Sequence, residues 1–149
     1  RFLMKLSLGY PQGDEAVALM QRFIAAQPLA ELSPVAKAEE IVSAADASKA
    51  VRVDVDVMKY MAALVEAARD PEKVRLGPSP RALLALMRAC QAWATIHGRD
   101  FVTPDDVKAL ALPVLAHRII SRSRNTVRVT DSNEIIISYI VDTIPAPIE

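Results

Sequence analysis

Helix-start signals recur along this chain and constrain its fold more than any other feature. A hydroxyl residue stands directly before proline at Ser33-Pro34, Ser79-Pro80 and Thr103-Pro104. The hydroxyl can accept a hydrogen bond from a first-turn N–H group, and proline suits the first helical position because the N–H that it lacks would have no partner there. We therefore predict a mostly α-helical bundle.

The expected helices are bounded by these signals and by apolar residues that recur at helical spacing. They run from Asp14 to Pro28, from Pro34 to about Ala47, from Asp54 or Asp56 to about Arg69, from 80 to 97, from 104 to about 120 with an interruption at Pro113, and from 132 to 143. The last segment is open to a strand assignment, because isoleucines 135–137 are β-branched. A helix is preferred because isoleucines also recur every four residues, at 136, 140 and 144, after a capping Asp131.

The helix at 80–97 is predicted to lie at the centre of the bundle. Between the N-cap Ser79 and Gly98 its residues are mostly apolar, apart from a stripe at Arg81, Arg88, Gln91 and Thr95. A helix that is apolar around most of its circumference is expected to be buried. The side chains expected among the best buried are Leu84, Met87, Cys90 and Trp93.

A short N-terminal strand is predicted at residues 3–8. Apolar and polar side chains nearly alternate there, and Gly9-Tyr10-Pro11 follows as a stop signal. A strand without hydrogen-bonding neighbours is prone to pair with another chain. We expect this one either to press onto the bundle or to be borrowed by a second copy. Because the first residue is Arg1 rather than Met, we also expect the sequence to be a piece of a longer protein.

The composition excludes several classes of protein. Hydrophobic residues make up 52% of the chain, and 18 basic side chains balance 18 acidic ones, which excludes intrinsic disorder. No apolar run approaches the ~20 residues of a membrane span, so no membrane partner is expected. The single Cys excludes an internal disulfide and favours a reducing, cytoplasmic location. Net neutrality argues against nucleic acid as a partner.

The neutral total conceals a basic middle region, in which residues 71–128 carry 10 basic and 4 acidic side chains. Arg81 falls in this region, in the first turn of the predicted central helix. A cation is electrostatically misplaced at a helix N-terminus unless an anion joins it, and the free N–H groups there suit a phosphate. Arg81 is therefore a candidate anion-binding residue. The alternative is a surface arginine that pairs with an acid such as Glu72.

Other chemistry is not supported by the motifs of the chain. Neither a Gly-x-x-x-x-Gly-Lys-Ser/Thr phosphate loop nor a Gly-x-Ser-x-Gly nucleophile motif occurs. His97 and His117 lie twenty residues apart without a supporting pattern, so no metal site is expected. His97 is more simply a charge that suits a helix C-terminus. Cys90 is expected to be a buried small hydrophobe.

Three motifs in one order resemble the C-terminal lid of MoxR-type AAA+ ATPases. They are Gly77-Pro-Ser-Pro-Arg-Ala-Leu-Leu-Ala-Leu86, Gly98-Arg-Asp-Phe-Val-Thr-Pro-Asp-Asp-Val107 and Val114-Leu-Ala-His-Arg-Ile119. The opening Arg1-Phe-Leu-Met-Lys-Leu-Ser-Leu-Gly-Tyr-Pro11 looks like the last strand of the ATPase core. The resemblance implies a division into residues 1–11, the end of that core, and residues 12–149, the helical lid.

The resemblance also implies roles for single residues. Arg81, with Ser79 beside it, matches the sensor-2 position, from which an arginine reaches the nucleotide phosphates held by the core. Arg1 matches the arginine of the family's Asp-Arg-Phe box, a possible arginine finger toward a neighbouring subunit. ATP and Mg²⁺ would be held by a core upstream of Arg1, which would carry the Walker A and Walker B motifs. Without them, this fragment should not hydrolyse ATP alone.

The family further implies a homo-oligomeric ring that remodels partner proteins in a chaperone-like way, often proteins with von Willebrand A-type domains. Two other readings stay open. One is a free-standing helical module that binds DNA, like a histone fold or a helix-turn-helix domain, and the basic middle region would suit it. Against it, aromatic residues are only 5%, and the basic residues are scattered over several elements: Arg88, Arg99, Lys108, Arg118, Arg122 and Arg124. The other is a purely structural interaction domain.

Overall fold

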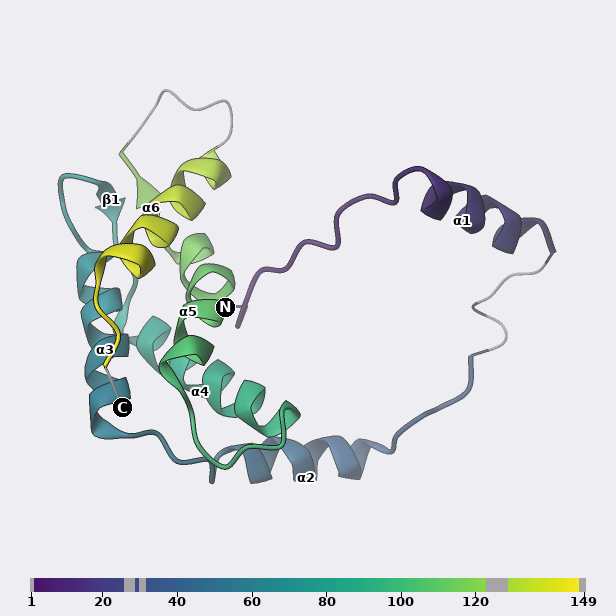
Figure 1. Cartoon of the computed structure of the whole chain (residues 1–149), viewed down its shortest axis with the longest axis horizontal. Coiled ribbons are helices and arrows are strands. Elements are labelled where there is room, and N and C mark those ends of the chain that lie inside the picture. The colour runs from purple at the N-terminus through teal and green to yellow at the C-terminus, as the bar shows by residue number, and fades with distance from the viewer. Residues whose placement is uncertain (1, 26–28, 30–31, 123–128, 148–149) are drawn as a thin grey trace. The chain divides into compact units, whose positions relative to one another are not determined.

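The chain is described by a computed structural model over residues 2–25, 29, 32–122 and 129–147 (Figure 1). It divides into two compact units, one formed by residues 1–5 and 44–149 and the other by residues 6–43. Six α-helices and two short strands lie in the described ranges, so the prediction of a mostly α-helical fold is confirmed.

The larger unit is built from four helices around one hydrophobic core. These helices are α3 (Val55–Ala67), α4 (Pro80–Ile96), α5 (Pro104–Leu115) and α6 (Val129–Thr143). The helix α5 contacts each of the other three, and about half of its side chains are buried. The segment predicted from 132 to 143 is a helix. It begins earlier than expected, so Asp131 lies within α6 rather than capping it.

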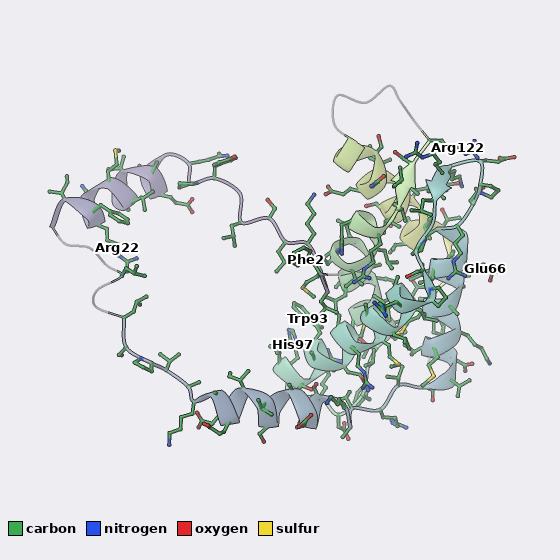
Figure 2. The ribbon with its side chains drawn as sticks, turned by 180° about the vertical axis from the view of Figure 1, so that it is seen from behind. Phe2, Arg22, Glu66, Trp93, His97 and Arg122 are labelled. Atoms are coloured by element: carbon green, nitrogen blue, oxygen red, sulfur yellow. The ribbon has the colours of Figure 1, made fainter. Side chains whose placement is uncertain are left out.

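The prediction that the helix at 80–97 is the central one is wrong, because α5 is more fully buried: six of its 12 side chains are buried, against six of the 17 in α4. Cys90 is buried as expected, but Met87 is half-buried and Leu84 is 59% exposed. Trp93 is 37% exposed at the C-terminal end of α4, next to His97 (Figure 2). The buried face of α4 consists mainly of small residues, which let the neighbouring helices approach closely: Ala82, Leu86, Ala89, Cys90, Gln91 and Ala94.

The start of α5 is a complete capping box, as the sequence predicts. The Thr103 hydroxyl accepts from the Asp106 N–H at 3.3 Å, and the Asp106 carboxylate accepts from the Thr103 N–H at 2.8 Å. Arg99 donates to both oxygens of the same carboxylate, at 2.6 and 2.8 Å. Burial would raise the pKa of Asp106, but these hydrogen bonds outweigh it and hold the pKa below its ordinary value.

The expected interruption of α5 at Pro113 does not occur. The helix continues through this proline to Leu115 and ends in a 3-10 turn, η2 (Ala116–Arg118). Pro113 lies in the last turn of α5. Its missing N–H therefore removes one hydrogen bond of the helix, near the point where the helix ends.

Two short strands form where the sequence analysis expects none. β1 (Val74–Leu76) pairs antiparallel with β2 (Ile120–Ser121), far away in the sequence. Asn133 of α6 braces this corner: its buried amide donates to the carbonyls of Ala116 and Ile119, and its oxygen accepts from the Ser121 N–H.

The predicted N-terminal strand does not form, because no described strand pairs with residues 3–8. Residues 2–5 nevertheless belong to the larger unit and contact it, whereas residues 6–8 belong to the smaller unit and are exposed. Only the first part of the segment is therefore pressed onto the bundle, which was one of the two outcomes expected. The Lys5 N–H donates to the Pro113 carbonyl at 2.8 Å, and Met4 packs against the core. The prediction that residues 1–11 end an ATPase core stays a prediction.

The smaller unit contains α1 (Asp14–Ala25) and the start of α2 (Ala38–Ser48). The helix α1 begins at the predicted residue, whereas α2 begins four residues after Pro34. The large apolar side chains of α1 are exposed: Val17, Leu19, Met20, Phe23 and Ile24. The extended segment before α1 contains Gly9 and Gly13, both at positive φ.

Candidate functional site

The first turn of α4 is an open helix N-terminus. Ser79 is the N-cap residue with an extended backbone, and Pro80 is the first helical residue, as predicted. The Ser79 hydroxyl makes no capping hydrogen bond, however, and the first turn contains no acidic residue. The positive end of this helix dipole is therefore not neutralised by its own sequence.

Arg81 is exposed in this first turn, and no described residue forms a hydrogen bond or ion pair with its guanidinium. The alternative in which Arg81 pairs with Glu72 is thus not formed in the described structure. An unpaired guanidinium, a free hydroxyl and a helix N-terminus are all donors or positive charges. This donor set fits a phosphate group and does not fit a cation.

The other arginines of the basic middle region mostly serve the fold. Arg88 donates to the Gln91 side chain, and Arg99 donates to the Asp106 carboxylate. Arg118 donates to backbone carbonyls, and Arg122 donates to the Val74 carbonyl. These guanidinium groups are therefore held by contacts within the protein. Arg75 on β1 and Arg81 make no such contact in the described structure, and of these two Arg81 lies at a helix N-terminus.

Arg69 positions the turn that leads into α4, and the sequence analysis did not identify it. Its Nε donates to the carbonyl of the buried Pro78 at 2.9 Å. A Cβ on Gly77 would lie 2.7 Å from the Arg69 Cγ and 2.9 Å from the Arg69 Cα, so only glycine allows this approach. The glycine in Gly77-Pro78-Ser79-Pro80 was the available signal, but its contact is with Arg69, which lies in the turn after α3.

Arg1 lies outside the described residues. The chain that follows it is held by Arg118, whose Nη2 donates to the Phe2 carbonyl at 2.7 Å and to the Leu3 carbonyl at 3.1 Å. Figure 2 labels Phe2 at the start of this segment. The structure thus fixes the backbone one residue after Arg1.

The sequence predicts neither a metal site nor a reactive nucleophile. Among the described residues, no group of three or more His, Cys, Asp or Glu side chains is placed to hold a metal. His97 Nδ1 lies 2.8 Å from the Trp93 carbonyl at the end of α4, where the sequence places it. Burial, together with the nearby Asp106 charge, raises the pKa of Cys90 to about 12, so this thiol stays protonated at neutral pH.

A cavity of about 400 Å³ lies elsewhere in the larger unit, lined by residues that include Arg52, Asp56, Phe101 and Pro147. Arg81 and Ser79 do not line it, and its acidic side chains make it a poor phosphate site.

No helix in the described ranges is both long and apolar enough to cross a bilayer.

Comparison with known proteins identifies the domain family of this chain. Residues 66–136 match the family of AAA lid domains. Chaperone MoxR1 of Mycobacterium tuberculosis is 28% identical over 99% of this chain and 41% of its own length. The chain carries a MoxR-type AAA lid domain. Arg81 and Arg118 lie inside the matched range, and Arg1 lies before it.

Two further similarities extend beyond the lid domain itself. YeaC of Bacillus subtilis is 38% identical over 80% of this chain and 37% of its own length. The crystal structure of a proposed ATPase from Cytophaga hutchinsonii is 25% identical, with a TM-score of 0.85 over 99% of this chain and 47% of that chain. The chain therefore spans less than half the length of each of these proteins.

Proposed function

We propose that this chain is the lid part of a MoxR-like AAA+ ATPase and that Arg81 is its sensor-2 arginine. In this role Arg81 contacts the terminal phosphates of ATP bound by the core of its own subunit. The observation that carries the proposal is the unpaired Arg81 guanidinium at the open N-terminus of α4. The match of residues 66–136 to AAA lid domains supports it.

The physical role follows from the donors present. A guanidinium offers paired N–H groups that match phosphate oxygens, and it remains charged at all relevant pH values. Arg81 would hold the phosphate end of the nucleotide, with the Ser79 hydroxyl beside it, and its position would report whether the terminal phosphate is present. When bound by the core, ATP would supply the phosphoryl group and Mg²⁺ would neutralise part of its charge.

The remaining parts of the proposal concern the longer protein. Arg1 is the arginine finger that reaches the nucleotide of a neighbouring subunit in a homo-oligomeric ring. Movement of the lid with nucleotide state then drives chaperone-like remodelling of a partner, such as a protein with a von Willebrand A-type domain, in the cytoplasm. The name of MoxR1, a chaperone, supports this direction.

The DNA-binding alternative is less well supported. It needs basic side chains that are free to neutralise phosphates along a duplex. Of the six residues that would supply them, Arg88, Arg99, Lys108, Arg118 and Arg122 already bond within the protein, and Arg124 lies outside the described residues.

The test uses the longer protein with its ATPase core and the variant Arg81→Ala. We expect turnover to fall by about 10²-fold, because one donor to the transferring phosphate is lost. Arg75→Ala is the matched control, since Arg75 is also exposed in the basic region but lies on β1. Unchanged turnover and ATP affinity in a folded, assembled Arg81→Ala protein would show that Arg81 is a surface residue that does not contact the nucleotide. The 149-residue chain alone should bind ATP negligibly.

A further inference from the structure

The connection between α3 and α4 is tied together at its base by one hydrogen bond. Arg69 lies in the turn after α3, and Pro78 stands directly before Ser79, the N-cap residue of α4. The Nε of Arg69 donates to the Pro78 carbonyl at 2.9 Å. This bond spans the connection and links the place of the α4 start to the end of α3.

Both partners of this bond are held by their surroundings. The Arg69 N–H donates to the Glu66 carbonyl at 2.9 Å, and the preceding Ala68 is fully buried. On the other side, Pro78 is buried, and a Cβ on Gly77 would lie 2.7 Å from the Arg69 Cγ. Because the two segments are closely packed, a displacement of one is passed to the other.

The N-terminus of α4 depends on such support because it has little of its own. The Ser79 hydroxyl makes no capping hydrogen bond, and the Pro80 nitrogen has no hydrogen to donate. At the start of the helix, the Ala82 N–H donates to the Ser79 carbonyl at 2.8 Å. A shift of Pro78 would disturb this bond first, because successive Cα atoms are only about 3.8 Å apart.

We propose that Arg69 is a positioning residue for Arg81 and acts through the Pro78 carbonyl. This inference rests on the proposed function, in which Arg81 contacts the terminal phosphates of ATP. Arg81 follows Pro78 by three residues, and the ring of Pro80 between them limits the backbone freedom of the turn. Such a contact is sensitive to position, since a displacement of about 1 Å can cost ~10²-fold in rate. Holding Pro78 therefore holds the backbone from which the Arg81 guanidinium reaches the nucleotide.

Arg69 brings a charge as well as a donor to the α4 start, since no acid in the described ranges forms an ion pair with it. Two substitutions of similar length separate these contributions. Arg69→Gln removes the charge but keeps an N–H donor, at the same number of bonds from Cα as the arginine Nε. Arg69→Met removes both. A positioning role predicts that Arg69→Gln behaves like the wild type and that Arg69→Met does not.

The first experiment needs no ATPase activity and uses the 149-residue chain. Amide hydrogen exchange of Ala82 reports opening of the α4 start, and that of Val107, which donates to Thr103 at the α5 start, is the internal control. In Arg69→Met we expect Ala82 to exchange about tenfold faster and Val107 to keep its rate, because only one helix start loses its support. Arg69→Gln should keep both rates.

Three outcomes of this experiment would overturn the inference. One is wild-type exchange of Ala82 in Arg69→Met, and another is equally fast exchange of Ala82 in both variants, which would assign the effect to the lost charge. The third is a Val107 rate that rises as much as that of Ala82, because that would show a general loss of stability.

The second experiment measures turnover in the longer protein with its ATPase core. Arg69→Met should lower kcat by about tenfold, because a displaced guanidinium keeps only part of its contact, and Arg69→Gln should keep kcat. In an Arg81→Ala background, Arg69→Met should have no further effect on kcat, since the two residues act as one unit. A further loss there would show that Arg69 does not act through Arg81. If Arg81→Ala loses turnover while Arg69→Met keeps it, the inference alone fails. If Arg81→Ala keeps wild-type turnover, the proposed function fails, and the inference with it.

Discussion

The helices α4 and α5 begin with the same sequence pattern, but their N-termini differ in charge. Each has a hydroxyl residue followed by proline, at Ser79-Pro80 and Thr103-Pro104. The α5 start is closed by its capping box and by Asp105 and Asp106 in the first turn, whereas the α4 start has an unused hydroxyl and a cation. A closed helix N-terminus is fully used by the fold, while an open one with an arginine remains ready for an external anion.

The largest expected effect comes from opening the α5 start. Asp106→Ala removes the carboxylate that bonds both Thr103 and Arg99, and it leaves their donors without that partner. We expect a loss of about 3 kcal/mol in the free energy of unfolding, measured by chemical denaturation. The neighbouring Asp105→Ala is the control, because Asp105 is exposed and pairs only with Lys108 at the surface. Equal effects of the two variants would show that the α5 start is not closed in this way.

Part of that effect should disappear in acid. The pKa of Asp106 is held below its ordinary value of 3.8 in the folded chain, so the unfolded chain binds a proton first as pH falls. The stabilisation is complete above this ordinary value and is lost as pH falls through the lower, folded-state pKa. The difference in unfolding free energy between wild type and Asp106→Ala should therefore narrow below about pH 4. A constant difference from pH 7 to pH 2.5 would contradict the assignment.

The two hydroxyl residues should differ in a smaller but measurable way. Thr103→Ala removes a capping hydrogen bond and should cost about 1 kcal/mol of stability. Ser79→Ala removes no such bond, so we expect a change within about 0.3 kcal/mol. Thermal denaturation of the two variants side by side checks this. A Ser79→Ala loss as large as that of Thr103→Ala would mean that the α4 start is also capped.

The smallest expected effect is a gain in stability at the α4 start. Arg81→Glu places an acid in a first turn that has none, and it should stabilise the 149-residue chain by about 0.5 kcal/mol. In the longer protein the same variant should abolish phosphate contact and turnover. The reverse change at the α5 start, Asp105→Arg, should destabilise by a similar amount. A destabilising Arg81→Glu would indicate that Arg81 already serves the fold.

The helix caps and turns of the fold could be predicted from sequence because the residues that form them lie within four positions of one another. The capping box at Thr103, the N-cap place of Ser79 and the positive φ of Gly98 all follow from neighbours along the chain. The place of Arg81 in a first turn is of the same kind. That its guanidinium has no described partner, however, depends on the surrounding surface and could only be seen in the structure.

The wrong predictions concern relations between elements. Leu84 and Trp93 look like core residues, but α4 packs through small residues, and its buried Gln91 donates to the Val51 carbonyl, 40 positions away. Nothing in residues 72–78 identifies the partner of β1, which arrives more than forty residues later. Hydrophobicity indicates that a helix is buried on some face, but the neighbouring elements decide which face.

The sequence by itself determined where α4 and α5 begin, how α5 is capped and that a cation stands at the start of α4. These properties depend on hydrogen bonds and dipoles within one helical turn, which the local sequence specifies. Only the tertiary structure decided that α5 is the central helix, that Arg69 supports the turn before Ser79 and that Arg118 holds residues 2 and 3. Each of these contacts joins segments that are distant in the chain, and their free energy arises only when the whole core has formed.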